Sequence, residues 1–122
     1  MNLTGQPPRQ KATRFPDDPQ RLARVRKEPC VICREFGEYQ FSATTAHHPI
    51  HGRCSQVKSP DAFAIPICDG HHQANFDDSK IALHRNPQEW KDIYGLDRDY
   101  INKVRADLGE DAISDEILGE WF

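Results

Sequence analysis

The sequence predicts a small α+β domain that is held together by a structural zinc ion. Four residues form two matched pairs, each with two residues between its members: Cys30 with Cys33, and Cys68 with His71. Short runs of strand type and of helical periodicity surround these pairs. With 122 residues and 37% apolar content, the chain is expected to form one domain whose modest core benefits from a metal.

A basic tail and one short helix are predicted before the first pair. Residues 1–16 contain three prolines and almost no periodic apolar residues, which indicates a flexible tail. Asp17 or Asp18 is expected to cap a helix that begins near Pro19 and ends before Pro29.

Two strands are predicted in the middle of the chain. The stretch from Tyr39 to His48 alternates and is rich in Phe and Thr, as is typical of a strand, and a turn at Gly52 follows it. A second short strand spans Phe63 to Ile67 and is weakened by Pro66, which suits an edge or terminal position. From His71 to about Asn75 the chain is expected to be helical.

The C-terminal third predicts two further helices. One begins at Pro87 and ends at Gly95, with Trp90 and Ile93 on its core side. The next begins at Asp97 and carries apolar residues at helical spacing, namely Tyr100, Ile101, Val104 and Leu108.

These elements divide the chain into a basic tail (1–16), a folded module (17–104) and an acidic helical extension (105–122). The apolar residues of the extension either pack on the same core, which is the default, or bind a partner; they are Ile113, Ile117, Leu118, Trp121 and Phe122.

The paired spacing favours zinc over disulfides. Thiolate and imidazole are the ligands that Zn²⁺ selects, and two residues between ligands let one tight turn hold one tetrahedral ion. Residues 1–15 lack the apolar segment of a secretory signal peptide, so we expect a cytoplasmic protein whose thiols stay reduced. Cys54 is left over, either as a thiol without a role or as a substitute ligand for His71.

The net charge of -3 conceals two halves of opposite sign. Residues 1–60 hold ten Lys and Arg against five Asp and Glu, and residues 61–122 hold six against fourteen. The basic half suits a polyanion such as DNA, whereas the acidic half folds away from it or meets another protein; alternatively, both are ordinary solvated surfaces. No run approaches the roughly 18 apolar residues of a membrane span.

Three histidines adjoin the predicted zinc site without being needed by it. His47 and His48 are adjacent in the first strand, and His72 directly follows the ligand His71. They are free for a second metal and a reaction. The order of a strand with a histidine pair, a loop, a strand, a zinc turn and a helix with a histidine is the ββα-metal arrangement.

Three segments carry a resemblance to a known family: PCVIC, AHHPIHGR and KSPDAFAIPICDGHH. They resemble the zinc-containing HNH endonucleases of phages and prophages, most closely the recombination-enhancement (Ref) nucleases, over roughly residues 20–96. The resemblance implies a divalent-metal-dependent DNA endonuclease of low sequence specificity, with a recombinase filament as a possible partner. The alternative is a noncatalytic zinc-ribbon module that binds nucleic acid or protein.

The resemblance also implies roles for individual residues. It places His47 and His72 on the catalytic ion and makes His48 the general base, and an imidazole with a pKa near 6.5 suits that role. The middle asparagine of the family motif is absent. Asp61 is the nearest polar candidate, which either orients His48 through its backbone or caps a turn.

A third ligand for the catalytic ion is not evident, because Phe76 stands where many relatives have a histidine. Asn75 and Asp77 are the neighbouring candidates, and an oxygen ligand would favour Mg²⁺ or Mn²⁺. His51 and His84 are better interpreted as loop histidines, although His51 is close enough to the pair to touch substrate.

Two basic residues are expected to contact DNA phosphates. Arg53 follows Gly52 in a segment similar to the HxxGR of the Ref proteins, and Lys58 supplies a second charge. Such contacts position DNA without reading its sequence. Alternatively, Arg53 pairs with a surface carboxylate.

Overall fold

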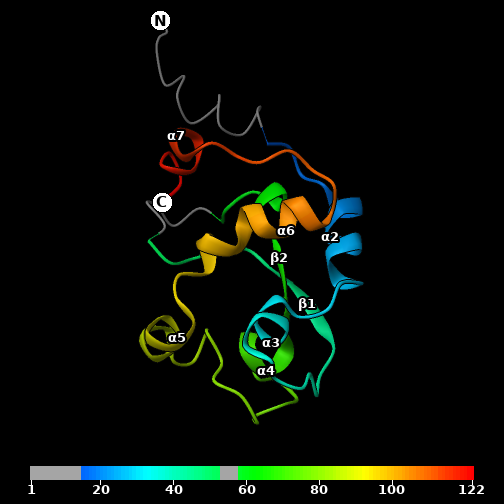
Figure 1. The fold of residues 1–122 in the computed structure, drawn as a ribbon, viewed down its shortest axis with the longest axis vertical. Coiled ribbons are helices and arrows are strands. Elements are labelled where there is room, and N and C mark those ends of the chain that lie inside the picture. Colours follow the sequence, from blue (N-terminus) through cyan, green and yellow to red (C-terminus); the bar gives the residue numbers. More distant parts are fainter. Residues whose placement is uncertain (1–14, 53–57) are drawn as a thin grey trace, which may run out of the picture.

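The structure is a computed structural model that describes residues 15–52 and 58–122. Its helices and two strands form a small α+β domain (Figure 1). The elements are, in chain order, α2 (Pro19–Arg26), α3 (Val31–Phe36), β1 (Thr44–His47), a 3₁₀ turn (Asp61–Phe63), β2 (Ile65–Cys68), α4 (Asp69–His72), α5 (Pro87–Tyr94), a second 3₁₀ turn (Asp97–Tyr100), α6 (Ile101–Asp107) and α7 (Asp115–Leu118). Within the described ranges no helix has the length and apolar character to cross a membrane.

The two strands form an antiparallel ribbon, with Thr44 opposite Cys68 and His47 opposite Ile65. The first strand is shorter than predicted, because the preceding segment is a loop in which the Gln40 amide donates to the Ser42 carbonyl and to Thr44 Oγ1. Pro66 lies in β2 as expected; a two-stranded ribbon has only edge strands, so its missing N–H is tolerated.

The predicted first helix, α2, is capped as expected and is fixed to the turn before β2. The Asp18 carboxylate accepts the Arg21 N–H at 3.0 Å, and Pro19 occupies the first turn. The buried Arg21 guanidinium donates to the carbonyls of Asp61, at 2.7 Å, and Ala64, at 3.1 Å, and pairs with Glu110 at 3.0 Å. Asp61 is thus held from the side of α2.

Both predicted metal-binding turns open short helices. Cys30 is the N-cap of α3, and Gly37 ends that helix in the left-handed region with φ of 64°. The second helix, α4, begins at Asp69 and ends at His72, two residues earlier at its start and about three earlier at its end than predicted. The reason is the Asp69 carboxylate, which accepts the backbone N–H groups of residues 75, 76 and 77 and turns the chain out of the helix.

The hydrophobic core lies between the ribbon and helices α3, α5 and α6. On α5, Trp90 and Tyr94 are buried, one turn apart. Ile93, predicted on the same side, is 47% exposed; the prediction was wrong because only one narrow stripe of this eight-residue helix meets the core. The default prediction for the C-terminal extension is confirmed, since five of its apolar residues pack against the core: Ile113, Ile117, Leu118, Trp121 and Phe122.

The two α5 positions provide a matched test of this packing. Trp90→Ala is expected to cost about 3–5 kcal/mol of unfolding free energy, because it empties a fully buried site and removes the indole hydrogen bond to the His71 carbonyl. Ile93→Ala should change it by less than about 0.5 kcal/mol. Urea denaturation measures both, and equal losses in the two variants would contradict the described core.

Candidate functional site

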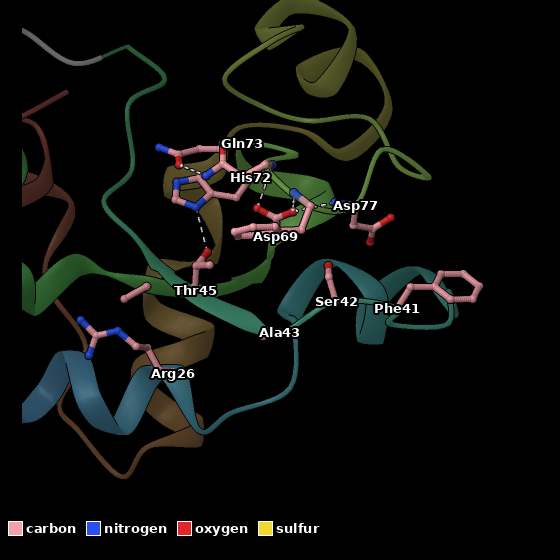
Figure 2. A pocket seen from close by; sticks show the side chains of 12 residues that line it. Arg26, Phe41, Ser42, Ala43, Thr45, Asp69, His72, Gln73 and Asp77 are labelled. Carbon is pink, nitrogen blue, oxygen red and sulfur yellow. Dashed lines mark hydrogen bonds between the residues drawn. The ribbon is translucent and has the colours of Figure 1, made fainter.

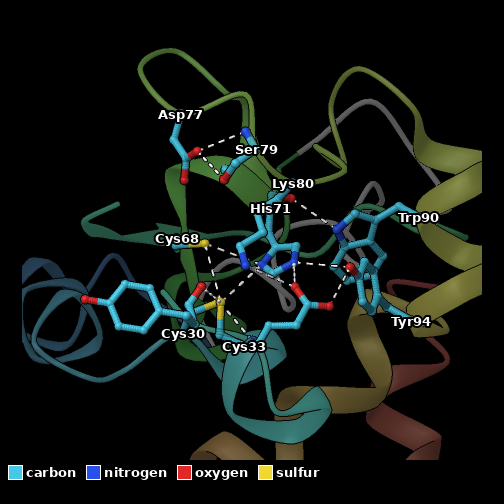
Figure 3. A network of polar contacts seen from close by, with 12 residues as sticks. Cys30, Cys33, Cys68, His71, Asp77, Ser79, Lys80, Trp90 and Tyr94 are labelled. Carbon is cyan, nitrogen blue, oxygen red and sulfur yellow. Dashed lines mark hydrogen bonds and ion pairs between the residues drawn. The ribbon is translucent and has the colours of Figure 1, made fainter. Parts of the chain in front are cut away.

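The four predicted metal ligands converge in one buried cluster (Figure 3). Cys30 and Cys33 come from the start of α3, Cys68 from the end of β2 and His71 from α4. His71 Nδ1 lies 3.6 Å from the sulfurs of Cys30 and Cys33 and 3.4 Å from that of Cys68. The sulfurs of Cys33 and Cys68 are 3.9 Å apart.

These distances match the edges of a tetrahedron around one ion. With bonds of about 2.3 Å to sulfur and about 2.0 Å to nitrogen, tetrahedral zinc separates two sulfurs by about 3.8 Å and sulfur from nitrogen by about 3.5 Å. Donor types, burial and spacing therefore fit a metal such as zinc. Cys54, the predicted substitute ligand, lies outside the described residues.

Burial and mutual contacts shift the pKa values of the thiols in this cluster. Hydrogen bonding with Cys30 lowers the pKa of the Cys68 thiol to about 4, and the same contact raises the pKa of Cys30. Burial raises the pKa of Cys33 to about 11. One thiolate in a buried site is a charge that a cation would compensate.

A second group of residues holds the His71 ring in place. Its Nε2 lies 3.1 Å from Glu38 Oε1, and Glu38 also accepts the Tyr94 hydroxyl at 2.9 Å and pairs with Lys80 at 3.3 Å. A carboxylate on the far nitrogen of a ligating histidine fixes the ring and its tautomer. Nδ1 is therefore left facing the thiols. Sequence reasoning missed Glu38, because an acidic residue in a loop gives no local signal for this contact.

A second cluster contains three histidines: His47 on β1, His72 on α4 and His84 in the loop before α5. One ring nitrogen from each lies within 4.8 Å of the others. Sequence reasoning treated His84 as a loop histidine, yet it completes this group. Asn75, the predicted oxygen ligand, is exposed, and its amide donates to Gln73 Oε1 at 2.9 Å.

Hydrogen bonds determine which His72 nitrogen is available. The Thr45 hydroxyl donates its proton to the Ile67 carbonyl at 2.7 Å, so it must accept from His72 Nδ1–H, 2.8 Å away (Figure 2). The lone pair of His72 is then on Nε2. Burial, followed by the neighbouring His47 and His84, lowers the pKa of His72 to about 3, so the ring is neutral at neutral pH.

His47 is oriented by a buried aspartate. Its Nε2 lies 2.7 Å from Asp97 Oδ2, and the same carboxylate accepts the backbone N–H groups of Ile50 at 2.7 Å and His51 at 3.1 Å. Although burial opposes ionisation, hydrogen bonds from His47 and His51 hold the pKa of Asp97 below its usual value. In a neutral His47 the lone pair is then on Nδ1. The sequence indicated Asp97 only as a helix start.

The donor set of the second cluster consists of imidazole nitrogens. Imidazole suits Zn²⁺ and the other late first-row ions, whereas Mg²⁺ takes oxygen ligands. The expectation of Mg²⁺ depended on an oxygen ligand such as Asn75, whereas the three side chains of this cluster offer nitrogen alone.

His48 and Asp61 form a pair next to this cluster. His48 Nε2 lies 2.7 Å from Asp61 Oδ1, while Asp61 Oδ2 accepts the Asp18 N–H at 2.8 Å. Asp61 thus orients His48 with its side chain, whereas the sequence suggested that it either orients His48 through its backbone or caps a turn. Burial lowers the pKa of His48 even though Asp61 opposes this, and the nearby charge of Lys58 lowers it further. His48 Nδ1 is the ring nitrogen left for chemistry.

His51 has a structural role. It is buried, its Nδ1 accepts the Asp97 N–H at 3.0 Å, and its Nε2 lies 3.3 Å from the Pro87 carbonyl. The turn after it needs glycine, because Gly52 has φ of 75° and a Cβ there would collide with the Arg98 guanidinium. Arg53, predicted to bind phosphate, lies outside the described residues.

Residues 8–108 match a family described as "Protein of unknown function (DUF968)". No curated protein and no solved structure matches the chain.

The purified protein is expected to hold one tightly bound ion in the cluster of three cysteines and His71. Cys68→Ser should weaken this binding by more than the roughly 10- to 100-fold that follows loss of an outer hydrogen-bond partner, because it removes a thiolate ligand. Elemental analysis after gel filtration measures the bound ion. Cys54→Ser is the matched control and should retain it; the opposite pattern would mean that Cys54 is the ligand.

Proposed function

Because the chain belongs to the DUF968 family, whose description assigns no function, we propose from its own side chains that it is a divalent-metal-dependent DNA endonuclease. The observation that carries the proposal is the pairing of His48 with Asp61 beside the cluster of three histidines. A histidine that is oriented by a carboxylate and adjoins a group of metal-type ligands has the parts of a hydrolytic site.

The two clusters would have different tasks. An ion among the three cysteines and His71 would be structural, because its ligands are buried and join α3 to β2 and α4. An ion at the second cluster would be held by His47, His72 and His84, and the exposure of His84 leaves this site accessible to substrate. When bound there, it would polarise a phosphate and stabilise the charge of the leaving oxygen.

His48 would act as the general base. Its Nδ1 takes a proton from water while the water oxygen forms a bond to phosphorus and the bond from phosphorus to the 3′ oxygen breaks. The 3′ oxygen leaves with the bonding electrons and is protonated by solvent, which gives a 5′-phosphate and a 3′-hydroxyl. Asp61, 2.7 Å away, keeps the ring oriented and stabilises the imidazolium that forms.

Charge supports a polyanionic substrate. Lys58 is exposed, and its charge reaches both His48 and Asp61. The first 60 residues carry ten basic side chains against five acidic ones. The charge of Lys58 beside the candidate base favours DNA backbone over an uncharged substrate.

His48→Ala is expected to reduce plasmid nicking by about 10²- to 10⁴-fold, because it removes the general base. A panel of divalent ions identifies the one that supports nicking. Circular dichroism and metal content should stay unchanged, and Ile93→Ala, at an exposed site, is the control variant. An active His48→Ala would exclude His48 as the base, and an inactive parent with every ion would favour the noncatalytic alternative.

A separate variant tests the third histidine. His84→Ala is expected to lower nicking and to raise the concentration of divalent ion needed for half-maximal activity, because one of three ligands is lost. Its tightly bound ion at the cysteine cluster should remain. Unchanged dependence on the ion would mean that His84 is not a ligand.

A further inference from the structure

A groove of about 610 Å³ lies beside β1, and His72 of the histidine cluster is one of its lining residues. His72 and Thr45 lie on its wall, and Figure 2 shows Phe41 at some distance from them and Arg26 across the strand on α2. The groove therefore adjoins the proposed reaction site through His72, which belongs to both.

Exposed aromatic rings gather at this groove. Phe76 is 95% exposed and Phe41 is 66% exposed, and both line it. Tyr39, 73% exposed, packs edge-to-face on Phe41 with 4.7 Å between ring centroids. Of the five large hydrophobic side chains that are exposed within the described residues, two therefore line this groove and a third contacts one of them. Solvent-exposed aromatic side chains at one groove indicate a binding surface for a flat, unsaturated ligand.

Polar groups around the rings suit a ligand with hydrogen-bonding edges and negative charge. Arg26 is exposed and forms no ion pair with any described residue, so its charge is available. Gln73 and Asn75 add exposed side-chain amides. Two carboxylates also line the groove. Asp69 accepts three backbone N–H groups, and Asp77 accepts from Ser79 with Oδ1, while its buried Oδ2 has no hydrogen-bond partner among the described residues.

We propose that this groove binds unpaired nucleobases, which makes single-stranded or locally unpaired DNA the preferred substrate. Every base offers a flat face for stacking on Phe41 or Phe76 and a polar edge for the amides, while Arg26 meets the backbone. In a duplex these faces are covered by neighbouring bases. This inference rests on the proposed function, since a base in the groove brings its strand to His72 and to the ion site beside it.

The test compares three fluorescent probes by anisotropy in metal-free buffer: an oligo-dT strand, an abasic strand of the same length and a duplex. The parent protein should bind oligo-dT about 10-fold or more tightly than the abasic strand, as expected for stacking of at least one base. Phe76→Ala should weaken oligo-dT binding about 5- to 100-fold and leave abasic binding unchanged. Ile93→Ala, exposed but outside the groove, should change neither.

The inference would be overturned if the parent bound oligo-dT and abasic strands equally, or if Phe76→Ala bound oligo-dT as tightly as the parent. The groove would then serve another partner. The proposed function is tested separately by nicking of single-stranded and duplex DNA. If the parent cleaves DNA but shows no base dependence, only the groove proposal fails. If base-dependent binding occurs without cleavage under any ion, the endonuclease proposal fails and the base-binding groove stands.

Discussion

The convergence of three cysteines and His71 fixes the rest of the candidate site. These ligands tie the start of α3 to the end of β2 and to α4, and they lie at the centre of a small core. His71 and His72 are consecutive on a four-residue helix, so their side chains diverge by about 100° around its axis. Holding His71 Nδ1 against the thiols therefore turns His72 toward β1, where Thr45 and His47 meet it.

Aspartates remote in sequence set the orientation of the two adjacent histidines. The Asp97 carboxylate is hydrogen-bonded to Nε2 of His47, and the Asp61 carboxylate to Nε2 of His48, each at 2.7 Å. In both rings Nδ1 is left for a ligand or a proton. Asp97 also binds the backbone after β1, and Asp61 is held by the N-terminus of α2. Distant parts of the chain thus fix the orientation of both histidines, which the proposed reaction would require.

Local chemistry explains which features the sequence could predict. Ligand spacing identified the four members of the first cluster, and capping residues located α2 and α5, because these signals involve neighbours in the chain. The contacts that it missed join distant segments: Glu38 with His71, Asp97 with His47, and His84 with His72. Carboxylates and loop histidines have no periodicity that reveals such partners, so only the folded backbone brings them together. The prediction that Ile93 lies in the core was wrong for a related reason, since helical spacing does not give the width of the buried face.

We propose that the protein holds two ions with different tasks, one among thiols and one among histidines. Anomalous diffraction from crystals grown with Mn²⁺ or Ni²⁺, with data at the zinc edge and at the edge of the added ion, tests it directly. We predict a zinc peak within bonding distance of Cys30, Cys33, Cys68 and His71, and a separate peak of the added ion between His47, His72 and His84. A single peak at the thiols, with the three imidazoles turned apart, would contradict the proposed reaction site.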